Sequence, residues 1–227
     1  MTLLAGIRAV VFDAVGTLIL PNPGAATVYT AVANRHGIAV DEGISERLWQ
    51  RFRIEDDLDR RAGWITSEAR ERERWRNIVS AAIPGASDDL FDELFRHFAK
   101  PSSWAVIDGV AHTLEKLRER GFVLALASNY DRRLESVVAG LPALAPLRQR
   151  VVTSSAVGYR KPASDFFCEG VLPAVGCDAG EVLFVGDDLE NDFLGARAAG
   201  LQAVLYDSRN RHEAVDERIR GMDELTA

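Results

Sequence analysis

Apolar residues along the chain gather in short runs that turn residues bound on each side. The runs are Ile7–Phe12, Phe122–Ala127, Val182–Val185 and Leu201–Tyr206, with Val151–Val152 as a weaker fifth. Polar residues do not alternate with apolar ones inside these runs, which is typical of strands covered on both faces, as in a parallel sheet. We therefore predict that these runs are strands of one parallel sheet.

Helical patterns separate the predicted strands. Residues Val110–Arg120 carry apolar side chains at helical spacing and stop at Gly121, a residue suited to ending a helix. A second helix is predicted from about Leu189 to Ala199, ending at Gly200. The repeated order of strand, helix and strand predicts an α/β fold with a doubly wound parallel sheet.

The segment 21–100 breaks this rhythm, because it contains amphipathic helical patterns and few strand-like runs. The helices predicted there are Ala25–His36, Ile44–Leu58, Ser67–Ala82 and Asp88–Phe98. The segment starts at Pro21–Gly24 and ends at Lys100–Ser103, and both stretches have the composition of hinges. We predict a helical domain at 21–100, inserted after the first strand into an α/β core formed by residues 1–20 and 101–227.

Composition and charge narrow the classes of function. With 227 residues, 47% hydrophobic and 27% charged, the chain is long enough to bury a core. Its formal net charge of −7 gives no general attraction to nucleic acid or to an anionic membrane. The charged stretch Arg70–Arg76 is interpreted as a solvated, salt-bridged helix face rather than a basic ligand-binding surface.

Cysteine content and the N-terminal stretch bear on location. The chain has two cysteines, Cys168 and Cys177, which favours free thiols in a reducing cytoplasm. The stretch 1–13 is apolar but is interrupted by Arg8 and closed by Asp13. It is too short for a membrane span and lacks the basic start and small-residue cleavage site of a signal peptide. We expect a cytoplasmic protein.

Polar and charged residues follow the predicted strands at the points where they end. In chain order they are Asp13, Ser128, Asn129, Lys161 and the acidic group Asp187, Asp188, Glu190 and Asp192. Ligands of open α/β sheets bind beyond the carboxyl ends of the strands. If the strands are parallel and adjacent, these residues come together at that edge.

This set of residues suits phosphoryl transfer. A carboxylate such as Asp13 can attack phosphorus once the repulsion between two anions is neutralised. Mg²⁺ held by oxygens of Asp13 and Asp187 would neutralise it. Lys161 would offset further charge, while Ser128 and Asn129 would hold phosphate oxygens. Each residue alone has an ordinary explanation as a cap, turn or loop residue, but their joint occurrence at four strand ends favours the catalytic interpretation.

Four motifs resemble those of the haloacid dehalogenase-like (HAD) hydrolase superfamily. They are FDAVGTL, ASN, the lysine of RKP and VGDDLEND, and they span nearly the whole chain. The helical insertion resembles the cap domain that one branch of this superfamily carries after its first strand. The stretches SNYDRRL, TSSAVGYRKP and GDDLENDFLGARAAG look closest to the group named after rhythmically expressed gene 2. The resemblance implies a Rossmann-like core, a helical cap and a hydrolase that acts on a small molecule.

The resemblance also implies roles for individual residues. Asp13 would be the nucleophile that forms an aspartyl-phosphate intermediate, and Lys161 would stabilise that intermediate. Contacts to the substrate's phosphoryl group are implied for Thr17, Ser128, Asn129 and Lys161. Mg²⁺ ligands are implied at Asp13, the backbone carbonyl of Val15, Asp187 and, close by, Asp192.

Val15 departs from the family pattern. Phosphatases of the superfamily usually carry a second aspartate there, which protonates the leaving group and later activates water. Valine can do neither, and general acid–base help is worth roughly 10²–10⁴-fold in rate. We therefore expect Mg²⁺-dependent phosphoester hydrolysis with weak or atypical acid–base catalysis.

Other activities within the superfamily do not use that acid. Haloacid dehalogenases read DAYGTL and need no metal, but their tyrosine corresponds to Val15 and their cap arginine to Gln50. They also lack an acid-rich fourth motif. Phosphonoacetaldehyde hydrolases use a cap lysine, whereas the lysines of this chain are Lys100, Lys116 and Lys161, and none lies in the predicted cap helices.

A third alternative is a nearly inactive phosphoryl-binding protein that retains the Mg²⁺ site. The sequence favours the phosphatase, with a small phosphorylated substrate and no nucleic-acid or membrane partner. We expect a monomer or a homodimer.

Overall fold

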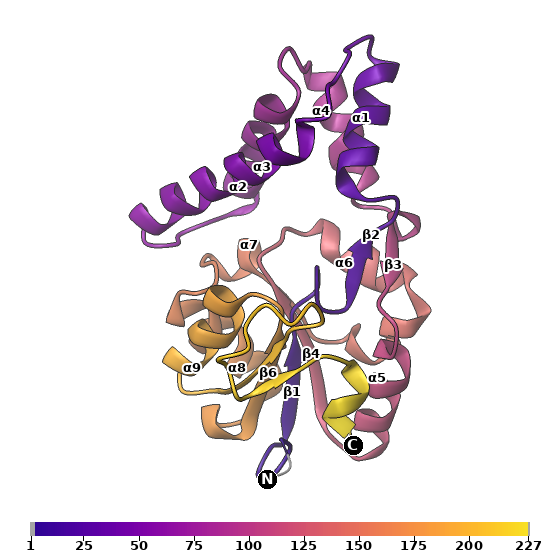
Figure 1. Cartoon of the computed structure of the whole chain (residues 1–227). Helices are drawn as coiled ribbons and strands as arrows, with labels where there is room; N and C mark the ends of the chain where they lie inside the picture. The colour runs from indigo at the N-terminus through magenta and orange to yellow at the C-terminus, as the bar shows by residue number, and fades with distance from the viewer. Residues whose placement is uncertain (1–2, 227) are drawn as a thin grey trace.

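The computed structural model describes residues 3–226 (Figure 1). Met1 and Thr2, which begin the N-terminal stretch considered above, and Ala227 lie outside the described residues. The main sheet has six parallel strands in the order β5-β4-β1-β6-β7-β8. They are β1 (Ala9–Phe12), β4 (Val123–Ser128), β5 (Val151–Thr153), β6 (Val182–Gly186), β7 (Gln202–Tyr206) and β8 (Arg218–Ile219). The predicted parallel sheet is confirmed.

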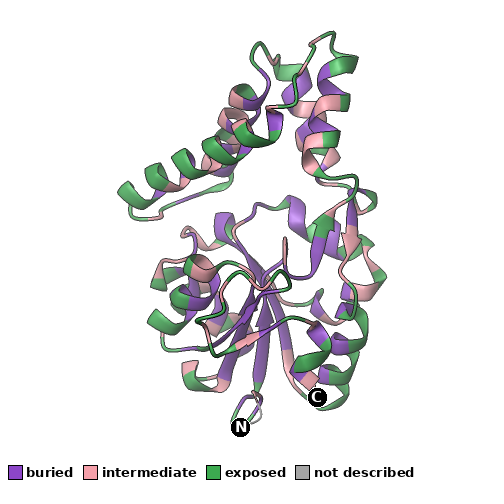
Figure 2. Ribbon diagram, viewed as in Figure 1, coloured by how far each residue is buried: buried purple, intermediate pink, exposed green. Residues whose placement is uncertain are grey.

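Strand β1 lies inside the sheet, paired with β4 on one side and β6 on the other. Val11, for example, is in register with Ala125 of β4 and Phe184 of β6. All four residues of β1 are fully buried, which explains the uninterrupted apolar run in the sequence (Figure 2). This position puts Asp13, the next residue, at the carboxyl edge of the sheet between two neighbouring strands.

Helices cover both faces of the sheet, each over its own apolar cluster. Phe12 faces the side covered by α5 (Val110–Glu119) and α6 (Arg133–Gly140). Val11 faces the side covered by α8 (Leu172–Val175) and α9 (Gly195–Ala198). The remaining helical elements are short. Four are 3₁₀ turns, at Pro101–Ser103, Pro142–Leu147, Ala179–Glu181 and Met222–Thr226. The others are α7 (Ser154–Val157) and two π-helical turns, at Phe166–Val171 and Leu189–Leu194. The fold is the predicted α/β arrangement.

Four longer helices lie beyond the carboxyl ends of the sheet strands (Figure 1). They are α1 (Ala25–Arg35), α2 (Ile44–Arg61), α3 (Glu68–Ala82) and α4 (Asp88–His97). Two short antiparallel strands, β2 (Ile19–Pro21) and β3 (Trp104–Val106), connect this helical segment to the rest of the chain. The side chains of Ser67 and Ser87 cap α3 and α4 by accepting hydrogen bonds from backbone amides of the first turn.

The prediction of a solvated face at Arg70–Arg76 is wrong for two of its seven residues. Glu71 and Arg74 are only 1% and 3% exposed. Three residues apart on a helix, they share one face of α3, and that face meets charged partners on α2 and on the main α/β unit. Alternating charges predict ion pairs, but they do not tell whether the partners are solvent-exposed or buried.

Cys168 is exposed and Cys177 partly buried, and both are free thiols. Within residues 3–226, no helix combines the length and the apolar character that crossing a membrane requires.

Candidate active site

Asp13 lies directly after β1 and is buried. Its backbone amide donates a 2.9 Å hydrogen bond to the carbonyl of Val185 in β6, which fixes the residue at the end of two paired strands. Its Oδ1 atom accepts hydrogen bonds from Oγ of Ser128, at 2.8 Å, and from Nζ of Lys161, at 2.7 Å. The residues expected at three strand ends therefore meet at one carboxylate.

Lys161 is 2% exposed, and carboxylates surround its ammonium. Besides Asp13, Nζ donates to Oδ1 of Asp192 at 2.5 Å and to the carbonyl of Ala127 at 3.3 Å. Burial opposes the charge on the lysine, but the attraction of Asp13 and Asp192 outweighs it and raises the pKa of Lys161 above its usual range. The lysine is a fixed positive charge in this site.

Asn129 fixes the backbone of the lysine. Its Nδ2 donates to the carbonyl of Lys161 at 3.0 Å, and its Oδ1 accepts from the amide of Lys161 at 2.8 Å. The sequence predicts a contact from Asn129 to the phosphoryl group, and it gives no sign of this pair of bonds. The side-chain amide therefore ties the end of β4 to the loop that carries the lysine.

Asp187 follows β6 and packs against the turn after β1. Its Oδ1 accepts a 3.1 Å hydrogen bond from Oγ1 of Thr17. Gly16 has φ +101°, and a Cβ atom there would collide with the Asp187 carboxylate, so the turn requires glycine. Burial, and secondly the nearby charge of Asp13, raise the pKa of Asp187 to about 6. Thr17, expected to contact the phosphoryl group, bonds to this acid.

Asp192 is 2% exposed and both its oxygens have protein partners. Oδ1 accepts from Lys161, and Oδ2 accepts from the backbone amide of Asp188 at 3.1 Å. Burial raises the pKa of Asp192, against the opposing attraction of Lys161. Asp188 itself accepts bonds from the backbone amides of Glu190 and Asn191, so it caps the following turn.

The acids of this edge could hold a divalent metal ion. Asp13, Asp187 and Asp192 each offer an oxygen within 4.8 Å of the others. Three carboxylates face one ammonium group, so a net negative charge suits a hard cation. Among residues 3–226, no hydrogen-bond donor occupies Oδ2 of Asp13 or Oδ2 of Asp187, whereas both oxygens of Asp192 are engaged. The donor set fits Mg²⁺ on Asp13 and Asp187.

Two positions bear on the alternative activities. Val15 packs its side chain against the larger apolar cluster and pairs through its backbone with Ile19, so it brings no acid to the site. Gln50, which stands where the dehalogenases are expected to have an arginine, is exposed and bonds to Glu46 on the same helix at 2.7 Å. It gives no positive charge for binding a carboxylate.

Comparison with known proteins identifies the class to which this fold and site belong. The model of the haloacid dehalogenase-like hydrolase family matches residues 7–200, and the chain belongs to that family of enzymes. It is 31% identical over 209 residues to haloacid dehalogenase-like hydrolase domain-containing protein 3 of Mus musculus, which covers 87% of this chain and 81% of the mouse protein.

Two further relatives carry names of different activities. The chain is 32% identical over 146 residues to a ribulose-1,5-bisphosphate 5-phosphatase of Halopiger xanaduensis, covering 63% of this chain and 59% of that protein. The chain is also similar to the crystal structure of a 2-haloacid dehalogenase from Pseudomonas syringae, with 26% sequence identity and a TM-score of 0.62. The match covers 97% of this chain and 96% of the dehalogenase chain. The family is therefore established, and the group named after rhythmically expressed gene 2 stays a prediction.

Proposed function

We propose that this hydrolase is a Mg²⁺-dependent phosphatase that acts on a small phosphorylated molecule through an aspartyl-phosphate on Asp13. One observation carries the proposal. The buried carboxylate of Asp13 has one oxygen held by Ser128 and Lys161, its other oxygen accepts no hydrogen bond within residues 3–226, and an oxygen of Asp187 lies within 4.8 Å of the carboxylate. A nucleophile that must meet a phosphate dianion needs these neutralising groups.

The chain's own residues supply most of the chemistry. The carboxylate of Asp13 attacks phosphorus, the bond to the leaving oxygen breaks, and an acyl phosphate forms. Lys161 and Ser128 hold the nucleophile and stabilise negative charge on the transferring group. Bound Mg²⁺, held by Asp13, the Val15 carbonyl and Asp187, would offset the charges of phosphate and carboxylate. Water then attacks the acyl phosphate, releases phosphate and restores the carboxylate.

The leaving group receives no proton from position 15. Val15 is apolar and packs against the core, so it cannot supply the proton that the leaving oxygen needs. We expect slow turnover on alkyl phosphates and faster turnover on aryl phosphates, whose leaving groups depart unprotonated.

A metal-independent 2-haloacid dehalogenase is the second candidate. The Pseudomonas syringae neighbour and the absence of an acid at Val15 favour it. The acids near Asp13 argue against it, because a reaction without metal has no need of three clustered carboxylates. The exposed Gln50 argues in the same direction. A nearly inactive phosphoryl-binding protein is the third candidate, and it would keep the metal site without turnover.

We also propose a domain arrangement, a location and an oligomeric state for the protein. Residues 1–20 and 101–227 are the catalytic core, and residues 21–100 are a cap over the carboxyl ends of the strands. Free cysteines support a cytoplasmic location, and the net charge of −7 supports the absence of nucleic-acid and membrane partners. The active form is a monomer or a homodimer.

A substrate screen tests the proposal. The purified protein is assayed on p-nitrophenyl phosphate, alkyl phosphate monoesters and 2-haloacids, with Mg²⁺ and with a chelator. We expect hydrolysis of the aryl phosphate only with Mg²⁺, and none by Asp13→Asn. Release of halide in the presence of chelator would establish the dehalogenase instead. Phosphate binding without turnover would favour the binding protein.

A further inference from the structure

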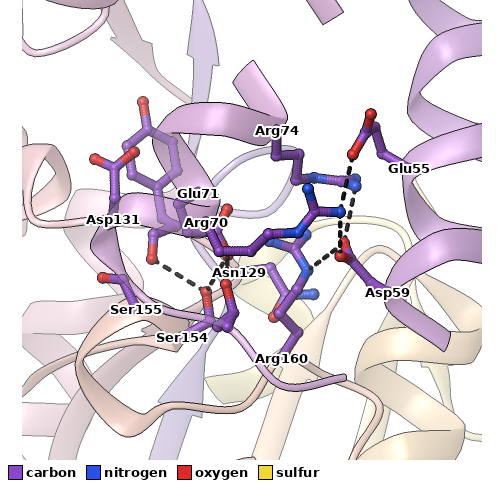
Figure 3. Close-up of polar contacts among 12 residues, drawn as sticks. Glu55, Asp59, Arg70, Glu71, Arg74, Asn129, Asp131, Ser154, Ser155 and Arg160 are labelled. Atoms are coloured by element: carbon purple, nitrogen blue, oxygen red, sulfur yellow. Dashed lines mark hydrogen bonds and ion pairs between the residues drawn. The ribbon is translucent and has the colours of Figure 1, made fainter. Parts of the chain in front are cut away.

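A buried ionic cluster lies where the cap helices meet the loop that carries Lys161 (Figure 3). We call it the interface cluster. Its members are Glu55 and Asp59 of α2, Arg70, Glu71 and Arg74 of α3, and Arg160 of the core. All except Arg70 are at most 5% exposed, although Arg, Asp and Glu are seldom fully buried unless they are paired.

Asp59 stands at the centre of the cluster. Its carboxylate accepts hydrogen bonds from Arg70 and Arg74, each at 2.9 Å. Nε of Arg160 lies 3.5 Å away, an ion pair without a hydrogen bond. Two of these guanidinium groups belong to the cap, and only Arg160 comes from the core.

Glu71 makes a closer link between cap and core. Its Oε1 atom accepts hydrogen bonds from Nη1 of Arg160 and, at 3.1 Å, from Oγ of Ser154, both core residues. It also accepts a 2.9 Å hydrogen bond from Oγ1 of Thr66, within the cap. One cap carboxylate therefore connects two segments of the core.

Backbone hydrogen bonds run beside these side chains. The amide of Arg160 donates to the carbonyl of Trp64 at 2.9 Å, and the amide of Thr66 donates to the carbonyl of Gly158 at 2.9 Å. Ile65 and Tyr159 form an antiparallel bridge between them. The loop between α2 and α3 thus pairs directly with the core loop that leads to Lys161.

Arg160 is the residue that precedes Lys161 in the chain. On its cap side it contacts Glu71 and Asp59, and on the core side Asn129 holds the backbone of Lys161 at both its amide and its carbonyl. From there Nζ of Lys161 reaches Asp13. A continuous series of contacts therefore joins the cap to the nucleophile.

Stability alone does not explain such a cluster. Burying ions costs desolvation energy, and apolar packing often stabilises a boundary as well or better. The loss of one partner, by contrast, leaves an unpaired buried charge, so a shift of the cap that separates Arg160 from Glu71 and Asp59 is unfavourable.

We propose that Arg160 is a positioning residue of the active site. Its ion pairs with Glu71 and Asp59 hold the cap and the Lys161 loop in one arrangement, and so couple the position of the cap to the placement of the lysine against Asp13. The inference rests on the proposed function, because it assumes that Lys161 serves in phosphoryl transfer.

Hydrogen exchange tests the contact without any need for activity. In Arg160→Gln, the backbone amides at positions 66 and 160 should exchange at least about tenfold faster, while those of β1 stay unchanged. Arg70→Gln is the matched control, because every pair of Arg70 lies within the cap, and it should leave both amides protected. Full protection in Arg160→Gln, or equal loss in both variants, would overturn the proposal.

A second variant keeps the positive charge and serves as the test if Arg160→Gln does not fold. Arg160→Lys retains a positive group but loses the planar fork of the guanidinium, so it should weaken the contact less than glutamine does. It is compared with Arg70→Lys in the same exchange experiment. Protection of both amides at the wild-type level in Arg160→Lys, together with wild-type kcat, would show that the guanidinium is not needed.

Kinetics then tests the coupling to catalysis. On p-nitrophenyl phosphate with Mg²⁺, Arg160→Gln and Glu71→Gln should each lower kcat about tenfold, with the double variant no worse than either, because both act through one contact. The loss should fall on kcat with KM little changed, and Arg160→Lys should restore part of it. Glu73→Gln, at an exposed position of the same helix as Glu71, is the control and should leave kcat within about twofold.

The two ways of failing are distinguishable. Additive losses, or wild-type kcat in Arg160→Gln, would overturn the positioning role while leaving the phosphatase intact. An inactive wild-type protein would refute the proposed function and the catalytic part of this inference. The exchange result would then still decide whether Arg160 joins cap and loop.

Discussion

Nζ of Lys161 lies 2.7 Å from Oδ1 of Asp13 and therefore gives the candidate nucleophile a positive partner from a distant part of the chain. The same ammonium lies 2.5 Å from Oδ1 of Asp192. One lysine thus offsets two buried carboxylates, and a third, that of Asp187, stands beside them. Within residues 3–226, the electrostatics of the site depend on this one cation.

Removal of that cation should destabilise the fold. Lys161→Met leaves the carboxylates of Asp13 and Asp192 buried without their partner, and breaking a buried ion pair typically costs about 3–5 kcal/mol. We expect a loss of about this size in the free energy of unfolding, measured by urea denaturation in the presence of a chelator. Lys116→Met, at an exposed position of α5, is the control and should change stability by less than about 0.5 kcal/mol. Equal stability of the two variants would contradict the charge assignment.

Asp187→Asn should weaken Mg²⁺ binding. Even residues that only support a metal ligand cost about 10–100-fold in affinity when they are changed, so the loss of a direct charged ligand should cost at least tenfold. Titration calorimetry of Mg²⁺ into the purified protein measures this. Glu190→Gln removes an exposed acid of the same motif and should have little effect. Unchanged affinity in Asp187→Asn would put the metal elsewhere.

Val15→Asp should supply the missing acid. The position lies on the turn after β1 and is only partly buried, so the burial cost of the new carboxylate is tolerable. We expect kcat on alkyl phosphates to rise by up to about 10²-fold, and kcat on aryl phosphates to rise much less, because only the alkyl leaving group needs a proton. Val15→Asn is the control, because asparagine has nearly the shape of aspartate but is not an acid. It should give no gain in kcat. Equal gains in both variants would mean that polarity rather than proton transfer matters.

The burial and pairing of Glu71 should make the free energy of unfolding depend on pH. Burial raises its pKa, but the charges and hydrogen bonds of Arg160, Thr66 and Arg74 outweigh burial and hold it below the ordinary value of 4.5. Since the folded state releases this proton more readily than the unfolded chain, the stability that Glu71 adds is complete above pH 4.5. It is lost as the pH falls through the lower, folded value. Urea denaturation should therefore show a shallower acid loss in Glu71→Gln than in wild type, and parallel curves would contradict this.

The core strands were predictable because their physical signal is strong. A strand such as β1, covered on both faces, must be apolar at every residue, and this appears directly in the sequence. Asp13 could be placed for the same reason, since an acid that ends such a run stands at the edge of the sheet. The α3 helix was likewise marked by Ser67, whose side chain caps it.

Other features depend on tertiary contacts that no local pattern reveals. Strand β8, at Arg218–Ile219, is two residues long and exists only through its pairing with β7. β3, at Trp104–Val106, has three residues and pairs with β2, which lies at the other end of the helical segment in the sequence. Short strands of this kind have no periodicity to detect.

The interface cluster was missed for a related reason. Glu71 and Arg74 look like members of a solvated charged helix, and their burial follows from Asp59 and Arg160, which are distant in sequence. The two hydrogen bonds between the Asn129 side chain and the backbone of Lys161 also join two separate segments of the chain. In the sequence, the arginine directly before Lys161 is the signal that could have indicated the interface cluster.

Detection of a covalent phosphate on Asp13 tests the central claim most directly. The protein is mixed with p-nitrophenyl phosphate and Mg²⁺, quenched in acid within a turnover, digested and analysed by mass spectrometry. We predict one phosphoryl group on the peptide that contains Asp13, absent with chelator and absent in Asp13→Asn. Aryl phosphate hydrolysis that proceeds at the wild-type rate in Asp13→Asn, or a phosphoryl group found on another residue, would contradict the account.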